Sequence, residues 1–185
     1  MLHTTDRETL GAVARASIRH GLRTGRALAP EADGYSGVLQ TPGASFVTLH
    51  RHAQLRGCIG SLEPRRALVS DVAENAFAAA FRDPRFSPLR EEEWETLRVE
   101  ISVLSAPQPM AFASEADLLS ILRPGVDGLI LQEGRLRGTF LPSVWTSLPQ
   151  PEAFLSHLKQ KAGLAQDYWS PTLKVWRYET ESFGA

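Results

Sequence analysis

The sequence has a single cysteine, no long apolar run and almost no net charge, and each of these scarcities excludes a class of protein. One cysteine in 185 residues cannot form an intramolecular disulfide, and it cannot supply the several thiolates of a cysteine-rich zinc or iron–sulfur site. No stretch approaches the roughly 18 consecutive apolar residues of a membrane-spanning helix, and the first residues lack the apolar core of a signal peptide. We therefore expect a cytoplasmic protein that does not bind membranes.

The charge balance excludes strong non-specific binding to polyanions. The chain has 20 basic and 21 acidic residues, so its overall field gives no reason to expect tight association with nucleic acid or with an anionic membrane. A local basic patch remains open. Arg15, Arg19 and Arg23 follow one face of the first expected helix, and this stripe is either a solvated helix face or an RNA-binding surface.

Helical and strand-like periodicities alternate along the chain without linker composition between them. Two of the strand pairs are joined by short turns, which predicts hairpins and a mainly antiparallel sheet with helices packed on it, the α+β class. Helices are expected over 6–22, 64–81, 91–97, 114–122 and 151–162, and strands over 46–49, 55–59, 99–103, 129–132, 135–140 and 173–178.

The single cysteine lies on the returning strand of the first hairpin, in the string LRGCIG over Leu55–Gly60. If Arg51 pairs with Gln54, Leu49 lies opposite Arg56 and Val47 opposite Cys58. This register predicts two faces. The more polar one carries Arg56 and Cys58, and the more apolar one covers the core with Phe46, Thr48, His50, Leu55, Gly57 and Ile59.

Two interpretations of Cys58 follow from this position. A thiol beside Arg56 in a cleft is a candidate nucleophile, because a nearby cation favours the thiolate. A free cysteine also packs often as a small buried hydrophobe. Gly57 and Gly60 either mark bulges or allow another backbone or a ligand to come close.

The second hairpin repeats the string Leu-Arg-Gly at residues 136–138, through duplication or coincidence. Pairing Gln132 with Arg135 places Arg137 and Thr139 on its polar face, where they echo Arg56 and Cys58. If the two halves pack together, both arginines line one cleft and form an anion site.

The acids nearest these motifs in the sequence are Glu63, Asp83 and Glu100. They either belong to the site or neutralise arginines such as Arg56 and Arg85 in structural ion pairs.

No histidine pairs simply with Cys58. His50 points to the opposite face in this register and His52 sits in the turn, so any general base has to come from elsewhere, such as His20 or His157. His50 and His52 also lack a third ligand for a metal ion. The sequence contains neither a Walker-type loop nor a GxGxxG motif, so neither a metal nor a cofactor is expected.

The LRGCIG string and the residues after it, Ser61 to Pro64, resemble the hallmark of the AMMECR-one domain family, known in prokaryotes as protein A of the AmmeMemoRadiSam system. The resemblance extends over nearly the whole chain in the family's order. The further matching strings are Glu74–Ala76 (ENA), Phe81–Phe86 (FRDPRF), Val99–Leu104 (VEISVL), Gly125–Leu129 (GVDGL), Arg137–Pro142 (RGTFLP), Phe154–Lys159 (FLSHLK) and Tyr168–Trp169.

The resemblance implies a fold and a context more than a reaction. It implies a single α+β domain over 1–185, with two unequal halves of about 1–105 and 106–185 around a cleft. The system's name implies a Memo-like protein and a radical S-adenosylmethionine (SAM) protein as partners. The six signature residues match without departure, so Arg56, Gly57 and Cys58 are carried over as site candidates, whereas the turn His52–Gln54 departs from the glycine-containing turn of relatives.

Three functional hypotheses remain open. The first is an accessory or binding protein that docks these partners or a substrate through the signature strand. The second is an enzyme or covalent carrier that uses Cys58 to modify a macromolecule or metabolite, with Arg137 holding an anionic group. The third is an RNA-binding adaptor that uses the stripe on the first helix, which the balanced charge disfavours.

Overall fold

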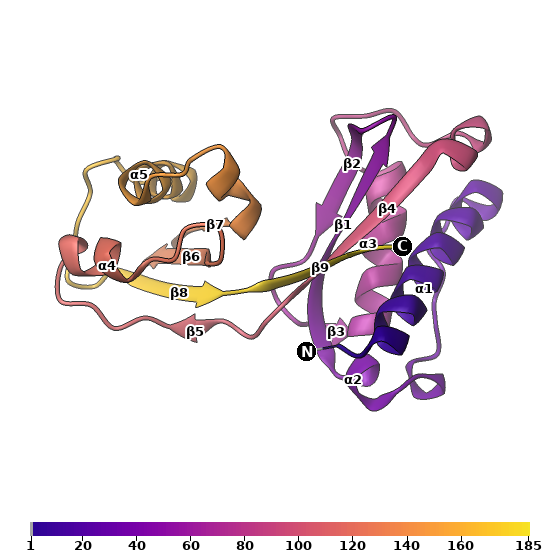
Figure 1. Ribbon diagram of the computed structural model, residues 1–185, viewed down its shortest axis with the longest axis horizontal. Helices are drawn as coiled ribbons and strands as arrows, with labels where there is room; N and C mark the ends of the chain where they lie inside the picture. Colours follow the sequence, from indigo (N-terminus) through magenta and orange to yellow (C-terminus); the bar gives the residue numbers. More distant parts are fainter. Residues whose placement is uncertain (1) are drawn as a thin grey trace. The chain divides into compact units, whose positions relative to one another are not determined.

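The computed structural model describes residues 2–185 and divides the chain into two compact units (Figure 1). Unit 1 comprises the chain up to Leu104 together with Glu181–Ala185, and unit 2 comprises Ser105–Thr180. Both contain helices and mainly antiparallel strands, so the predicted α+β class is confirmed. No helix within residues 2–185 has the length and apolarity that crossing a membrane requires.

Unit 1 is built on one sheet with the strand order β2-β1-β4-β9. Short strand β3 pairs with the beginning of β1. The strands are β1 (Pro42–Arg51), β2 (Gln54–Gly60), β3 (Arg66–Ala67), β4 (Leu97–Leu104) and β9 (Thr180–Gly184). The helices are α1 (Thr4–Thr24), α2 (Gly37–Gln40) and α3 (Leu68–Phe81), with 3-10 turns at Ala32–Gly34 and Glu91–Thr96.

Helix α3 places the apolar stripe that its sequence predicts against the sheet and against α1 (Figure 1). Val69, Val72 and Ala76 are fully buried there. The helix begins at Leu68 and not at Pro64 as expected, because residues 66–67 extend the sheet by pairing with Pro42 and Gly43. Its C-terminal half lies beneath β2 and thereby supports the signature strand.

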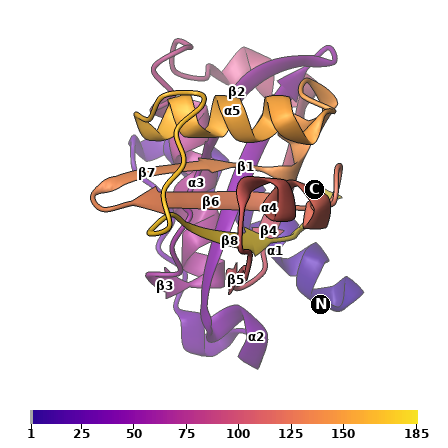
Figure 2. The same ribbon diagram turned by 90° about the vertical axis from the view of Figure 1, so that its left-hand side faces the viewer.

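Unit 2 is a second sheet, with the order β5-β8-β6-β7, and α5 lies along β7 and β6 (Figure 2). Helix α5 has the bounds that the sequence predicts, and Gly163, which follows its last residue, has the left-handed conformation that glycine favours. The elements are β5 (Gln108–Pro109), α4 (Glu115–Ile121), β6 (Gly128–Glu133), β7 (Leu136–Phe140), a 3-10 turn at Pro142–Thr146, α5 (Pro151–Ala162) and β8 (Lys174–Tyr178).

The predicted register of the first hairpin is correct at its turn and wrong beyond it. Arg51 pairs with Gln54, and positive φ angles at His52 and Ala53 make the tight turn without glycine. A bulge then leaves Arg56 as the extra residue of β2. Cys58 therefore lies opposite Thr48, not Val47, and Leu49 lies opposite Gly57, not Arg56.

The bulge also reverses the predicted face of β1. Val47 and Leu49 are fully buried, whereas Phe46, Thr48 and His50 are only half-buried. Gly57 faces helix α3, since a Cβ built on it would meet the carbonyl oxygen of Ala79. Because neighbouring residues of a strand point to opposite sides, Cys58 projects away from α3.

In the second hairpin the predicted turn lies one residue too early. Glu133 pairs with Leu136, and Gln132 pairs with Arg137 instead of Arg135. Gly134 follows Glu133 with a φ of +56° and allows this turn. The register moves by two residues on β7, so each residue stays on its predicted face. Thr139 pairs with Ile130, on the same face as Arg137.

Candidate functional site

The thiol of Cys58 is partly exposed on the face of β2 turned away from α3. Its Sγ lies 3.2 Å from Oγ1 of Thr48, the residue opposite it on β1. This neighbour is a neutral hydroxyl, which is not a general base at neutral pH. The position agrees with the predicted polar face, although the register that led to that prediction was wrong.

Two residues of the loop after α3 form hydrogen bonds with the backbone of Cys58, on the unpaired side of edge strand β2. Oδ2 of buried Asp83 accepts the Cys58 N–H at 2.9 Å, and Nη2 of Arg85 donates to the Cys58 carbonyl at 3.4 Å. Arg85 also binds Asp83 through Nε at 3.0 Å and Nη2 at 2.7 Å. These two residues of the FRDPRF string satisfy the edge strand as a neighbouring strand would.

The Asp83–Arg85 pair is electrostatically strong. The hydrogen bond from Arg85 is the main cause that holds the pKa of Asp83 well below its usual range, with backbone N–H groups of Cys58 and Arg85 adding to it. Asp83 raises the pKa of Arg85 in turn, and Cys58 contributes to that increase. The guanidinium associated with the cysteine is therefore that of Arg85, which the sequence indicates only as a partner for acids.

Arg56 is bound to a glutamate that sequence reasoning missed. Its Nε and Nη2 donate to Oε1 and Oε2 of Glu93 at 2.8 and 3.0 Å, and Nη2 also donates to the Ser87 carbonyl at 3.0 Å. The hydrogen bond from Arg56 is the main cause that lowers the pKa of Glu93 to about 2. Both side chains are nearly buried, with 13% and 10% of their surface exposed.

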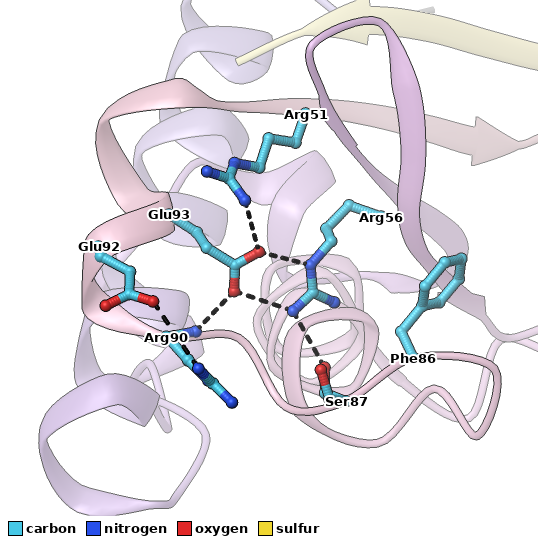
Figure 3. Close-up of a pocket in the computed structure, with 7 residues that line it drawn as sticks. All are labelled: Arg51, Arg56, Phe86, Ser87, Arg90, Glu92 and Glu93. Atoms are coloured by element: carbon cyan, nitrogen blue, oxygen red, sulfur yellow. Dashed lines mark hydrogen bonds and ion pairs between the residues drawn. The ribbon is translucent and has the colours of Figure 1, made fainter.

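These groups form the wall of a surface pocket of about 260 Å³ (Figure 3). Figure 3 shows Glu93 at its centre, between the guanidinium groups of Arg51 and Arg56. Nη1 of Arg51 lies 3.4 Å from Oε1 of Glu93, and the backbone N–H of Arg90 donates to Oε2 at 3.0 Å. The lining residues are Arg51, Arg56, Phe86, Ser87, Arg90, Glu92 and Glu93.

Gly57 agrees with both interpretations that the sequence left open, a bulge and the close approach of another backbone, whereas Gly60 lies against a side chain. Gly57 follows the bulge directly, and a Cβ on it would lie 2.1 Å from the Ala79 carbonyl oxygen, so only glycine allows α3 to come this close. A Cβ on Gly60 would lie 2.2 Å from the ring of Phe46. Both glycines serve packing. The predicted acid Glu63 forms an exposed ion pair with Arg65 at 2.7 Å.

The remaining predicted site residues, Arg137 and Thr139, belong to unit 2. Arg137 is exposed on β7. Oγ1 of Thr139 donates to the Leu129 carbonyl at 2.8 Å and lies 3.1 Å from the hydroxyl of Tyr178, whose pKa burial raises to about 12. A shared cleft that contains both Arg56 and Arg137 stays a prediction.

A buried polar cluster in unit 1 also escaped the sequence analysis. Asp71 accepts hydrogen bonds from Ser45, Ser61, Arg66 and Asn75. A buried carboxylate needs such donors, and the cluster ties the end of β2 to α3. The signal was present in the sequence, because Asp71 lies within the apolar stripe of a helix and Ser61 follows the signature directly.

The arginine stripe of α1 has a packing role. The guanidinium carbons of Arg15 and Arg19 lie 4.7 and 5.1 Å from the ring centroid of Trp94, within the range of cation–π attraction.

His157 lies on α5 and contacts the Ala153 carbonyl one helical turn earlier through Nδ1 at 2.8 Å. Across residues 2–185, no three His, Cys, Asp or Glu side chains are arranged to hold a metal ion.

Comparison with known proteins agrees with the resemblance of the signature. The model of the AMMECR1 family matches residues 11–183. A protein of Methanothermobacter thermautotrophicus is 40% identical over 177 residues, covering 95% of this chain and 92% of its own. A protein of Methanocaldococcus jannaschii is 37% identical over 174 residues, covering 92% and 85%.

A solved structure has the same fold. The crystal structure of an uncharacterised protein from Pyrococcus horikoshii matches with a TM-score of 0.84 and 35% identity, covering 96% of this chain and 90% of that one. The family match spans the signature strand, the FRDPRF loop and Glu93 as well as all of unit 2. The chain therefore belongs to the AMMECR1 family.

Proposed function

We propose that the protein is a binding component of the AmmeMemoRadiSam system that docks a Memo-like protein and a radical SAM protein in the cytoplasm, and that it carries out no covalent chemistry itself. One observation carries this proposal. The signature arginine Arg56 is held by two hydrogen bonds to Glu93 in the wall of an open pocket. A guanidinium fixed in this way suits recognition, and arginine is enriched among residues that dominate binding between proteins.

The surroundings of Cys58 support a role without catalysis. A nucleophilic cysteine needs a base within hydrogen-bond reach or a cation that favours its thiolate. Within residues 2–185, the hydrogen-bond partner of the thiol is the hydroxyl of Thr48. Arg56 shares its charge with Glu93, and Arg85 shares its charge with Asp83. A stable surface formed by the signature supports a binding role, and the two partners are proposed from the system name that the signature's resemblance implies.

Complex formation by purified proteins tests the proposal. The full chain is mixed with the Memo-like and radical SAM proteins encoded in the same genome, and complexes are detected by size-exclusion chromatography with light scattering. We expect the wild-type chain and Cys58→Ser to form the same complex with at least one of them. Absence of any complex, or a folded Cys58→Ser chain that cannot replace the wild-type chain in the cell, contradicts the proposal.

A second candidate function is an enzyme or covalent carrier that uses Cys58. The observation that favours it is Arg85, whose guanidinium lies against the Cys58 backbone and whose pKa Cys58 helps to raise. In that case iodoacetamide alkylates Cys58 faster in the folded protein than in the urea-unfolded chain near neutral pH.

The alkylation rate separates the two candidates. As a binding protein, the folded chain reacts with iodoacetamide no faster than the unfolded one, and Arg85→Ala leaves that rate nearly unchanged. A rate several-fold above the unfolded control that falls in Arg85→Ala selects the covalent function.

A further inference from the structure

The pocket beside Arg56 has more positive charge than its own carboxylates can pair with. Glu93 already accepts four hydrogen bonds, two from Arg56 and one each from the Arg51 side chain and the Arg90 backbone. Four is about the capacity of a carboxylate. The acceptor capacity of Glu93 is therefore used up, mainly by Arg56 and through one long contact by Arg51.

Arg51 and Arg90 retain donors that face the pocket. Arg51 uses Nε on Thr96 and one long contact from Nη1 on Glu93, and in residues 2–185 its Nη2 has no hydrogen-bond partner. The side chain of Arg90 forms a long ion pair with Glu92 at 3.8 Å (Figure 3), and 73% of it is exposed. Both contacts are long, and the three arginines of the pocket face only two glutamates, so one positive charge is left to bind an anion from outside.

Arg56 adds a third donor that the described part of the chain leaves unpaired. Its Nη1 is buried and has no hydrogen-bond partner. Figure 3 shows this nitrogen on the side of Phe86, whose ring centroid lies 5.9 Å from the guanidinium carbon. A buried donor without an acceptor is unfavourable, so this wall favours an added negative charge over further cations.

The size and openness of the pocket decide which kind of anion fits. Its volume of about 260 Å³ lies below the roughly 300–1,000 Å³ of sites that enclose a small molecule. The two available cations are on its rim, and 38% of the Arg51 side chain is exposed. A short carboxylate presented from another surface fits such an opening, whereas a metabolite needs walls that enclose it.

We propose that this pocket receives the carboxylate of an aspartate or glutamate side chain from a partner protein, which Arg51 and Arg90 bind while Arg56 and Glu93 form the fixed wall. The inference rests on the proposed function and deepens it, because it states the chemistry by which a partner is recognised. A rim ion pair between proteins changes affinity modestly and depends on salt.

The first experiment tests the pocket without any partner. Arginine Nε–H signals of the ¹⁵N-labelled full chain are followed by NMR during titration with acetyl-Gly-Glu-Glu-Gly-amide, with its glutamine analogue and with inorganic phosphate. We expect saturable shifts of the Arg51 signal with the glutamate peptide only, lost in Arg90→Ala. Absence of a saturable shift overturns the inference, and so does phosphate binding as tightly as the peptide.

The second experiment uses whichever partner forms a complex. We expect Arg51→Ala and Arg90→Ala each to weaken binding roughly fivefold, with a smaller effect at high salt. Arg23→Ala is the matched control, because Arg23 is an exposed arginine of α1 that bonds the carbonyl of Arg19 on its own helix. A complex that tolerates both pocket variants overturns the inference and leaves the proposed function intact. If wild type forms no complex, the proposed function fails, and the peptide titration alone decides the inference.

Discussion

The two Leu-Arg-Gly hairpins use the same string for the same packing but differ in what they do with the arginine. In both, the glycine lies against the backbone of a helix, Gly57 against Ala79 of α3 and Gly138 against Ala162 of α5. Only the first has a bulge at the arginine, and there Arg56 turns to Glu93. Arg137 sits in regular register and is exposed.

The difference shows that a short repeated string can specify a packing contact without specifying a site. Glycine is required wherever strand and helix backbones come this close, so both hairpins have it. The site of unit 1 depends on an acid from outside the hairpin, because Glu93 is 37 residues away in sequence from Arg56. The hairpins therefore share a structural motif, and only the first is joined to the arginine pocket.

The largest expected effect comes from filling the glycine contact. Gly57→Ala places a methyl group 2.1 Å from a backbone oxygen, whereas Gly138→Ala places one 2.9 Å from a backbone nitrogen. We expect losses in the free energy of unfolding of about 3 kcal/mol and about 1–2 kcal/mol, respectively. Urea unfolding followed by tryptophan fluorescence, which arises from Trp94 in unit 1 and from Trp145, Trp169 and Trp176 in unit 2, measures them.

Gly37→Ala is the control for these substitutions, since Gly37 has neither a neighbour within 4 Å of a Cβ nor a positive φ. Equal losses at positions 57 and 138 contradict the difference in contact distance. A tolerated Gly57→Ala shows that α3 moves away from β2 at little cost.

The next largest effect separates the two arginines. Arg56→Gln removes the main cation from Glu93, whose side chain is 10% exposed, and leaves a nearly buried carboxylate with one long contact to Arg51. We expect a loss of about 2 kcal/mol in unfolding free energy, somewhat below the cost of breaking a fully buried pair. Arg137→Gln at an exposed position should cost less than about 0.5 kcal/mol. Comparable losses in urea unfolding refute the assigned difference.

A feature of this fold can be predicted from the sequence when residues close together in the sequence determine it. Local periodicity predicts the bounds of α5, the stripe of α3 and the Arg51–Gln54 pair. The alternation of apolar and polar residues does not reveal a bulge, and one extra residue changes the parity of every pair after it. The partner predicted for Cys58, Val47, is therefore wrong. The Arg56–Glu93 pair and the return of β9 to unit 1 depend on long-range contacts that no local pattern encodes.

A smaller expected effect concerns how the free energy of unfolding depends on pH, and it also tests the pairing of Arg56 with Glu93. The pKa of Glu93 is about 2 in the folded chain, below its ordinary value of 4.5, so between these values the unfolded state binds more protons. Stability from this group is present above about pH 4.5 and is lost as the pH falls toward 2. This group contributes at most about 1.4 kcal/mol per pH unit.

Comparison of wild type with Arg56→Gln isolates that contribution. Without the guanidinium, the pKa of Glu93 rises, and the unfolding free energy of unit 1 falls less steeply below pH 4.5. Asp83 titrates in both proteins, because its partner Arg85 is unchanged. Parallel pH profiles for the two proteins refute the assignment to Glu93.

The smallest expected effect comes from making the two strings identical over one further residue. Cys58→Thr converts LRGC into the LRGT of the second hairpin. The side chain is partly exposed, threonine favours strands, and its hydroxyl can replace the sulfur beside Thr48. We therefore expect a change below about 1 kcal/mol in unfolding free energy and unchanged co-elution with a partner. If Cys58→Thr keeps its stability but loses the complex, the thiol has a chemical role, and the two hairpins differ at this residue as well as at the arginine.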